Sequence, residues 1–365
     1  MFLAPRDNSF YTELVQATKR ASGSESSSLG SCSGSQIAQR LKATQNSVRS
    51  QKSVLEDASG VGRHLVNVGG GLAAGEMGIN YDPYLQGNQP YPLFSFDDGK
   101  QDATCIRMGT PTRQTVLGTE EVAPEFCAFL QGLPHDFQHL YINRQKRSGV
   151  EGGRSKTLEE FQDSPESSGK LTVVTFPADG ELYEQKGSYS GDCTFSDMSG
   201  QLVDAMVSNS NGFYFPEKFR KELGGEEPFK AFLHHAMEMM ATELEVVQGK
   251  PMDVSLRRAC IFHLLNKTLP EHMLKELKAE TYNNTCKDDI DRGGMANAYM
   301  YLCKTAPASV QDSNMLEAWM QDVEGVVFAP AITVKKREVI QHRFDDLTNA
   351  LERLPFWNKG EVARE

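Results

Sequence analysis

Cys286 and Arg292 are six positions apart in the stretch TCKDDIDRGG, residues 285–294. Two glycines follow the arginine, and the apolar periodicity predicts a helix over residues 295–303. The amides of such a loop and of the helix start would form a concave anion site, and their positive end would favour the cysteine thiolate. An arginine at the end of the loop can fork two phosphate oxygens at once. The spacing therefore indicates a thiolate that attacks phosphorus.

The expected reaction is covalent. The Cys286 thiolate would attack phosphorus in line, while Arg292 and the loop amides stabilise the equatorial oxygens. The leaving oxygen needs a proton from a general acid. Asp288, inside the loop, is the preferred candidate for this acid. Asp291 could instead orient the arginine, and Asp179 is a candidate from outside the loop.

The charge, the apolar runs and the cysteines of the sequence argue against several classes of protein. The 365 residues carry a net charge of −11, which argues against a general nucleic-acid binder. The sequence contains no run of about 18 apolar residues, so no membrane-spanning helix is predicted. Residues 1–20 lack the apolar core of a secretory signal peptide. The seven cysteines form no CxxC pair, so they are expected to be reduced thiols rather than a disulfide framework or a zinc site.

The chain divides into two parts. Residues 1–58 are expected to be a flexible and helical N-terminal segment. Within it, residues 21–35 are low-complexity, and the helix expected over 36–58 has few large apolar residues, which places the segment outside the core. Residues 59–365 are expected to form the catalytic domain, with room for a small appended subdomain.

The second part mixes strand and helix patterns without strict alternation. Residues 149–170 are polar and glycine-rich, and are expected to form a mobile surface excursion. We therefore predict an α/β or mixed α+β fold in which helices flank one central sheet. Strands are expected at 104–108, 139–143, 171–176 and 326–334, and helices at 228–247, 254–266, 270–280, 313–320 and 340–354.

Two further patterns could indicate a nucleotide site and a metal site, but each is better explained as ordinary structure. Residues 61–80 are glycine-rich and fit a relaxed GxGxxA form, but glycines continue where a phosphate-binding helix should start, so a turn region is expected. His234 and Glu238 are four apart on one expected helix beside His235, and no third metal ligand is evident. No metal or cofactor is therefore predicted.

The loop CKDDIDR, residues 286–292, resembles the C-x-D-x-x-D-R loop of Sac-type phosphoinositide phosphatases. It is also similar to the C-x5-R loops of secreted bacterial effector phosphoinositide phosphatases of the SidF and SidP type. The resemblance covers about ten residues and implies a cysteine-phosphatase-like catalytic domain with Cys286 as nucleophile and Arg292 as phosphate ligand. It further implies a 3-phosphatase acting on PtdIns(3)P or PtdIns(3,5)P2. The protein would be a secreted effector in the host cytosol, peripheral on endosomal-type membranes.

The loop also departs from related patterns. Many such phosphatases carry a serine or threonine directly after the arginine, and Gly293 stands there instead, so the second chemical step is expected to be slower or assisted otherwise. Protein tyrosine phosphatases have a histidine before the cysteine and a glycine three residues after it. Thr285 and Asp289 at those places argue against that branch.

Charges in the loop bear on the substrate. Three carboxylates against the single Lys287 should repel a headgroup with many phosphates, which favours a mono- or bisphosphate. Basic groups at residues 144–147 and 335–337 are candidates for contact with anionic lipid. The residues expected to contact the substrate are Lys287, Asp289, Ile290, Asp291, Gly293, Lys335 and Lys336.

Two other functions remain open. The same loop would suit a phosphatase of soluble inositol phosphates or of phosphoproteins. Gly293 also keeps open a non-catalytic protein that binds phosphoinositides as a scaffold. The oligomeric state is not predicted.

Overall fold

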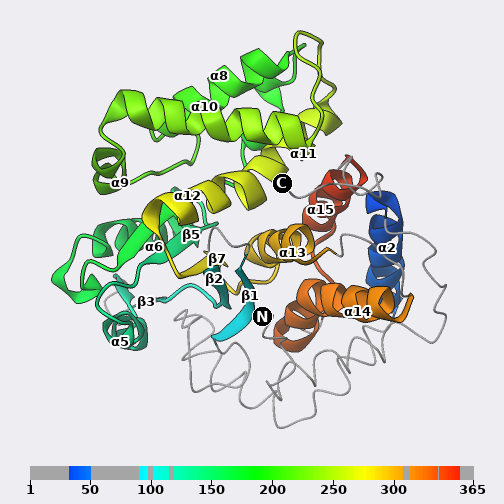
Figure 1. Cartoon of the computed structure of the whole chain (residues 1–365). Helices are drawn as coiled ribbons and strands as arrows, with labels where there is room; N and C mark the ends of the chain where they lie inside the picture. The colour runs from blue at the N-terminus through cyan, green and yellow to red at the C-terminus, as the bar shows by residue number, and fades with distance from the viewer. Residues whose placement is uncertain are drawn as a thin grey trace.

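A computed structural model describes residues 33–50, 90–97, 102–114, 119–306, 313–335 and 337–353 (Figure 1). The glycine-rich residues 61–80, most of the low-complexity segment 21–35 and Lys336 lie outside the described residues.

A five-stranded sheet lies at the centre, in the order β1-β2-β7-β5-β6. β2, β7, β5 and β6 run parallel, and β1 adds an antiparallel edge. The expected α/β architecture, with helices flanking one mostly parallel sheet, is confirmed. The strands are β1 (Tyr91–Asp97), β2 (Asp102–Arg107), β5 (His139–Asn143), β6 (Leu171–Thr175) and β7 (Thr281–Thr285), with a separate pair β3 (Thr112–Gln114) and β4 (Glu120–Val122).

Helices account for most of the remaining structure, and none among the described residues is both long and apolar enough to cross a bilayer. The helices are α2 (Gly34–Ser50), α5 (Pro124–Gly132), α6 (Gly149–Phe161), α7 (Glu181–Glu184), α8 (Phe195–Val207), α9 (Glu217–Glu222), α10 (Glu226–Glu243), α11 (Val254–His263), α12 (Leu269–Leu277), α13 (Arg292–Thr305), α14 (Ser313–Pro330) and α15 (Gln341–Arg353). Short 3₁₀ turns are η3 (Pro165–Ser167) and η4 (Gly187–Tyr189), and π-helical turns are η5 (Leu264–Thr268) and η6 (Ala331–Lys335).

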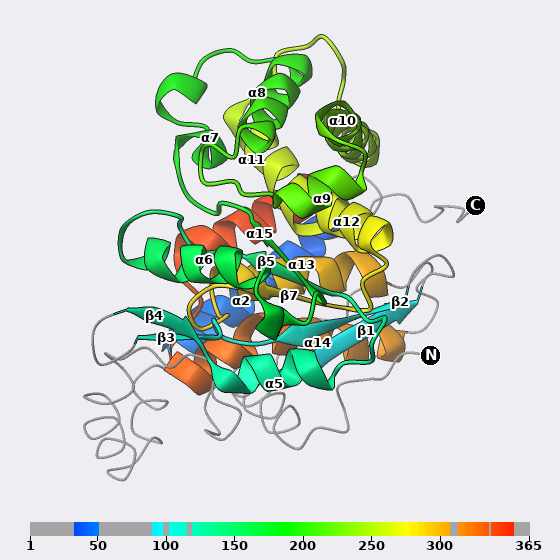
Figure 2. The same cartoon turned by 90° about the vertical axis from the view of Figure 1, so that its left-hand side faces the viewer.

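The two faces of the sheet have separate cores. Tyr141 and Val173 point to one face, where α5 and α6 cover them. Their neighbours Leu140, Ile142 and Val174 point to the other face, against a larger core that includes α13. Figures 1 and 2 show α5 and α6 on one side of the strands, α13 on the other, and α8 and α10 in a further layer above.

β7 is the central strand, and its sequence TYNNT did not predict it. A buried parallel strand is usually recognised as an apolar run, whereas four of these five residues are polar. Their buried polar groups are satisfied locally. The His139 ring nitrogens hydrogen-bond to Thr281 at 2.9 Å and to Asn283 at 2.8 Å. Burial lowers the pKa of His139 to about 4, so the ring is neutral in this network at pH 7.

Helix α2 corrects the expectation that the N-terminal segment lies outside the core. Ile37, Leu41 and Val48 are fully buried on one face of the helix. Arg40, beside them, makes a bidentate ion pair with Glu317 of α14 at 2.5 and 2.8 Å. A few apolar residues are enough to anchor α2 in the core because they all lie on one face of the helix.

Two other expectations were wrong. Residues 149–170 form α6 and η3 rather than a surface excursion, because α6 packs on β4 and β6 and tertiary contacts outweigh its glycines. Residues 326–334 are helical rather than a strand: they continue α14 to Pro330 and enter η6. An apolar run alone does not distinguish a buried helix from a buried strand.

Candidate active site

The loop with Cys286 and Arg292 joins the central strand to a helix. β7 ends at Thr285, Cys286 follows, and α13 begins at Arg292. The loop therefore lies at the carboxyl end of the parallel strands, the edge at which ligands bind in open α/β sheets. It also lies at a helix N-terminus, whose free amides favour an anion.

A pocket of about 410 Å³ opens at this edge. It contains six of the predicted loop residues and six residues from elsewhere in the chain. Asp289 and Gly293 are not among the residues that line it, because they are buried beneath the loop. The lining residues are Lys146, Glu151, Asp179, Cys286, Lys287, Asp288, Ile290, Asp291, Arg292, Ile340, His342 and Arg343.

Glu151 of α6 holds the Arg292 guanidinium. Its two carboxylate oxygens accept hydrogen bonds from Nη1 at 2.8 Å and Nη2 at 2.5 Å. Burial alone would lower the pKa of Arg292, but Glu151 and the Cys286 sulfur raise it above its usual value. No described residue accepts a hydrogen bond from Nε, so the Nε edge of the guanidinium is available to a phosphate.

The carboxylates of the loop are paired with cations from other elements. Lys335 Nζ lies 3.0 Å from Asp288, and Arg337 Nη2 lies 2.8 Å from Asp291. Asp291 also accepts the backbone N–H of Ile340 at 3.1 Å. The repulsion expected from these carboxylates is therefore offset by Lys335 and Arg337, whose pairing with the loop was not predicted.

Asp179, the candidate acid from outside the loop, also lines the pocket. Arg343 donates to its carboxylate, and Arg292 Nη1 and Lys146 Nζ each lie 3.8 Å from it. Three cations around one carboxylate make Asp179 an organiser of the basic groups in the pocket. Asp288, the preferred acid, lines the same pocket, and so does His342, which sequence reasoning missed.

The basic group at residues 144–147 is only partly a surface patch. Arg144 is 2 % exposed; its guanidinium donates to Asn284 at 2.7 and 3.2 Å, and burial lowers its pKa to about 10. Arg147 pairs with Glu159 at 2.8 Å. Lys146 is exposed and lines the pocket, so it is the lysine of this group that can meet a ligand.

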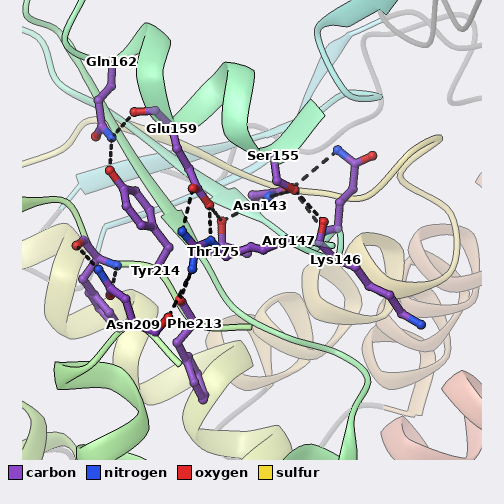
Figure 3. A network of polar contacts seen from close by, with 12 residues as sticks. Asn143, Lys146, Arg147, Ser155, Glu159, Gln162, Thr175, Asn209, Phe213 and Tyr214 are labelled. Atoms are coloured by element: carbon purple, nitrogen blue, oxygen red, sulfur yellow. Dashed lines mark hydrogen bonds and ion pairs between the residues drawn. The ribbon is translucent and has the colours of Figure 1, made fainter. Parts of the chain in front are cut away.

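A polar network fixes the segment after β5 that carries Lys146 (Figure 3). Ser155 of α6 donates to the Lys146 carbonyl at 2.9 Å and accepts from Asn143 at 2.9 Å. Glu159, one turn further along α6, bridges Arg147 and Thr175 of β6. The network joins α6 to β5 and β6, and the Lys146 backbone N–H donates to Glu151 at 2.8 Å, so Glu151 is held where it binds Arg292.

Other predicted features fall outside this site. His234 and Glu238 are exposed on α10, and the described residues hold no group of three side chains suited to a metal ion. All six cysteines in the described ranges are free thiols. Glu151, Arg343 and His342 had no signal in the sequence, because each becomes a pocket residue only through tertiary packing.

Comparison of the chain with protein-family models, curated proteins and solved structures found no match.

Proposed function

We propose that this protein is a cysteine-dependent phosphatase that hydrolyses phosphoinositides through a phosphocysteine at Cys286. The observation that supports this most is the meeting of Cys286 and Arg292 in one pocket at a strand–loop–helix junction, with Arg292 oriented by Glu151. A thiol, a phosphate fork and helix amides around one cavity are the parts that phosphoryl transfer to sulfur requires.

In the first step, the Cys286 thiolate forms a bond to phosphorus as the bond from phosphorus to the inositol oxygen breaks. The Nε edge of Arg292 and the loop amides hold the equatorial oxygens. The leaving oxygen takes a proton from the general acid, for which Asp288 is our candidate. Because Asp288 is paired with Lys335 in this structure, it must leave that ion pair and take up a proton from solvent before it donates one to the leaving oxygen.

In the second step, water forms a bond to phosphorus and the sulfur–phosphorus bond breaks, which regenerates the thiolate and releases phosphate. The proton lost by the water returns to the deprotonated acid. Because the uncatalysed hydrolysis of phosphate monoesters is extremely slow, all of these groups must contribute.

The pocket suits a lightly phosphorylated headgroup. Four carboxylates line it besides its cations, and they can accept hydrogen bonds from free inositol hydroxyls. Lys287 forms no ion pair with a described residue and is available to a second phosphate. We therefore favour PtdIns(3)P or PtdIns(3,5)P2, the 3-position being taken from the resemblance of the loop alone.

The pocket rim suits contact with a membrane. Ile340 lines the pocket with 40 % of its surface exposed, and Lys146 and Lys335 are exposed nearby in the same site. An apolar side chain flanked by lysines favours an anionic bilayer surface. In this proposal the protein works as a secreted effector at endosomal-type membranes of a host.

Phosphate release from vesicles that carry each phosphoinositide in turn tests the function, with soluble inositol phosphates in parallel. Cys286→Ser should abolish release, and Cys127→Ser, a half-buried cysteine of α5, should leave it unchanged. Equal release from wild type and Cys286→Ser would contradict the proposal. Preference for soluble substrates would favour the first alternative, and vesicle binding without release would favour the scaffold. A trisphosphate as best substrate would contradict the expected headgroup.

A further inference from the structure

The two departures of the loop from related sequences, Asp289 and Gly293, are coupled in space. A Cβ atom on Gly293 would stand 2.0 Å from Oδ1 of Asp289 and 2.4 Å from the carbonyl oxygen of Asn284. Real Cβ atoms essentially never approach other atoms this closely. The side chain of Asp289 and the β7 backbone at Asn284 therefore both occupy the volume that a side chain at position 293 would need, so only glycine fits there.

Asp289 is the centre of a buried network beneath the loop. It is fully buried, and its φ of 51° lies in the left-handed region that aspartate tolerates better than most residues. Its Oδ2 accepts from Asn297 of α13 at 3.2 Å and lies 3.8 Å from Nε of Arg107. Asn297 in turn accepts from Asn284 of β7 at 3.1 Å. One carboxyl group thus connects β2, β7 and α13 below the pocket.

Arg107 shows what this network does to the loop backbone. Its Nη2 donates to the carbonyl oxygens of Asp288 at 2.6 Å and Asp289 at 3.3 Å. Carbonyls held from below are turned away from the pocket, which leaves the concave side of the loop to N–H groups. That orientation is the one an anion site needs.

We propose that Asp289 is the positioning residue of this loop: its carboxyl group packs against Gly293 and, with Arg107 and Asn297, keeps the loop in its anion-binding shape. The inference deepens the proposed phosphatase and rests on it only for the identity of the natural anion.

Burial favours a neutral carboxyl group at Asp289, while its contacts with Arg107 and Asn297 favour the charged form. Oδ1 has no hydrogen-bond partner among the described residues, so an ionised carboxyl group would leave one buried acceptor without a donor. Burial raises the pKa of Asp289 to about 7, against the opposing charge of Arg107. The titratable and charged groups whose charges interact with it are Arg107, Arg144, Tyr91, Cys105 and Tyr141.

Protonation links this position to pH. An acid whose folded-state pKa is raised from 3.8 to about 7 stabilises the fold fully below pH 3.8, and this stabilisation is lost as the pH rises through 7. The ionised form also places a negative charge directly under the anion site. Anion affinity should therefore fall between about pH 6 and pH 8 as Asp289 ionises.

Removal of the Asp289 carboxyl group tests the positioning role. Asp289→Gly, which suits the positive φ, should lower the melting temperature and reduce tungstate affinity, measured by calorimetry, at least tenfold, because Arg107 and Asn297 lose the group that joins them. Asp289→Asn keeps the shape of the side chain and an acceptor for Asn297, so it should retain most of the melting temperature and, at pH 6, most of the affinity. Asp289→Gly behaving as wild type, or Asp289→Asn binding tungstate at pH 6 as weakly as Asp289→Gly, would overturn the proposal.

Asp289→Asn tests whether ionisation of Asp289 lowers anion affinity, since the amide has the shape of a protonated carboxyl group and cannot ionise. Both proteins carry Cys286→Ser, which removes the titration of that thiol. Tungstate affinity should fall several-fold from pH 6 to 8 when Asp289 is present and stay flat in the Asp289→Asn variant. Parallel pH profiles of the two proteins would refute the role of Asp289. Neither melting temperature nor tungstate binding requires turnover, so failure here is distinct from failure of the phosphatase proposal.

Discussion

The Arg292 guanidinium is oriented by its two hydrogen bonds to the Glu151 carboxylate, while Asp179 lies further away at 3.8 Å. Glu151→Gln keeps the shape and removes the charge. We expect kcat/KM for phosphate release to fall about ten- to a hundredfold, because an arginine that is free to turn no longer presents its Nε edge to the phosphate. Glu121→Gln is the matched control, since Glu121 pairs with Arg113 at 2.6 Å away from the pocket and should leave the rate unchanged. Equal rates for the two variants would contradict this role of Glu151.

Among single residues, the sequence singled out two residues that line the pocket but not the residues that hold them in place. Cys286 and Arg292 were identified because a nucleophile, an arginine and two glycines follow one another in the chain. Glu151 was not identified, because it lies on α6, in a segment whose glycines favoured the prediction of a loop. The charge of the loop was also misjudged from sequence alone, since Lys335 and Arg337 neutralise its aspartates from across the fold.

The elements that carry the site were predicted unevenly, for physical reasons. β5 and β6 were recognised because buried parallel strands are apolar runs, and their bounds are close to those expected. β7 is just as buried but uses asparagine and threonine, whose hydrogen bonds to His139 and Arg144 exist only in the folded sheet. α14 was taken in part for a strand because an apolar run fits either structure.

The segment between η6 and α15 places one exposed apolar residue at the pocket rim. Ile340→Asn should weaken binding to vesicles that contain PtdIns(3)P several-fold, because burying a side chain of this size in a bilayer interface contributes on the order of 1–2 kcal/mol. Sedimentation of the protein with vesicles measures this. Val247→Asn, at an exposed apolar residue that does not line the pocket, is the control and should bind as wild type. Equal loss in both variants, or no loss in either, would argue against membrane contact at this rim.

The molecule as a whole is joined across its layers by a half-buried cluster of charges. Glu243 of α10 pairs with Lys267 of η5 and hydrogen-bonds to His263 of α11 at 2.5 Å. Glu271 of α12 lies 3.4 Å from Lys267 and 3.3 Å from Lys304 of α13. The cluster thus links the helices above the sheet to α13, the helix that carries Arg292 at its start. Such connections between distant segments have no signature in local sequence patterns.

Glu243 gives this cluster a defined dependence on pH. Burial alone would raise the pKa of Glu243, but the hydrogen bond from His263 and the charge of Lys267 outweigh it and bring the pKa down to about 2. A carboxyl group with a lowered pKa stabilises the fold above its usual pKa of 4.5, and this stabilisation is lost as the pH falls toward 2. Burial also lowers the pKa of His263, so protonation of that ring in the unfolded chain adds to acid destabilisation.

Glu243→Gln should therefore reduce the free energy of unfolding by about 2 kcal/mol at pH 7, and the difference from wild type should shrink as the pH falls below 4.5. Urea unfolding at pH 7 and at pH 3 measures both values. Glu226→Gln on the same helix is the matched control, because Glu226 pairs with Lys230 at 2.8 Å on the exposed face of α10 and should change stability little at either pH. A loss with Glu243→Gln that is the same at pH 3 as at pH 7 would show that packing, and not the charge of Glu243, joins these helices.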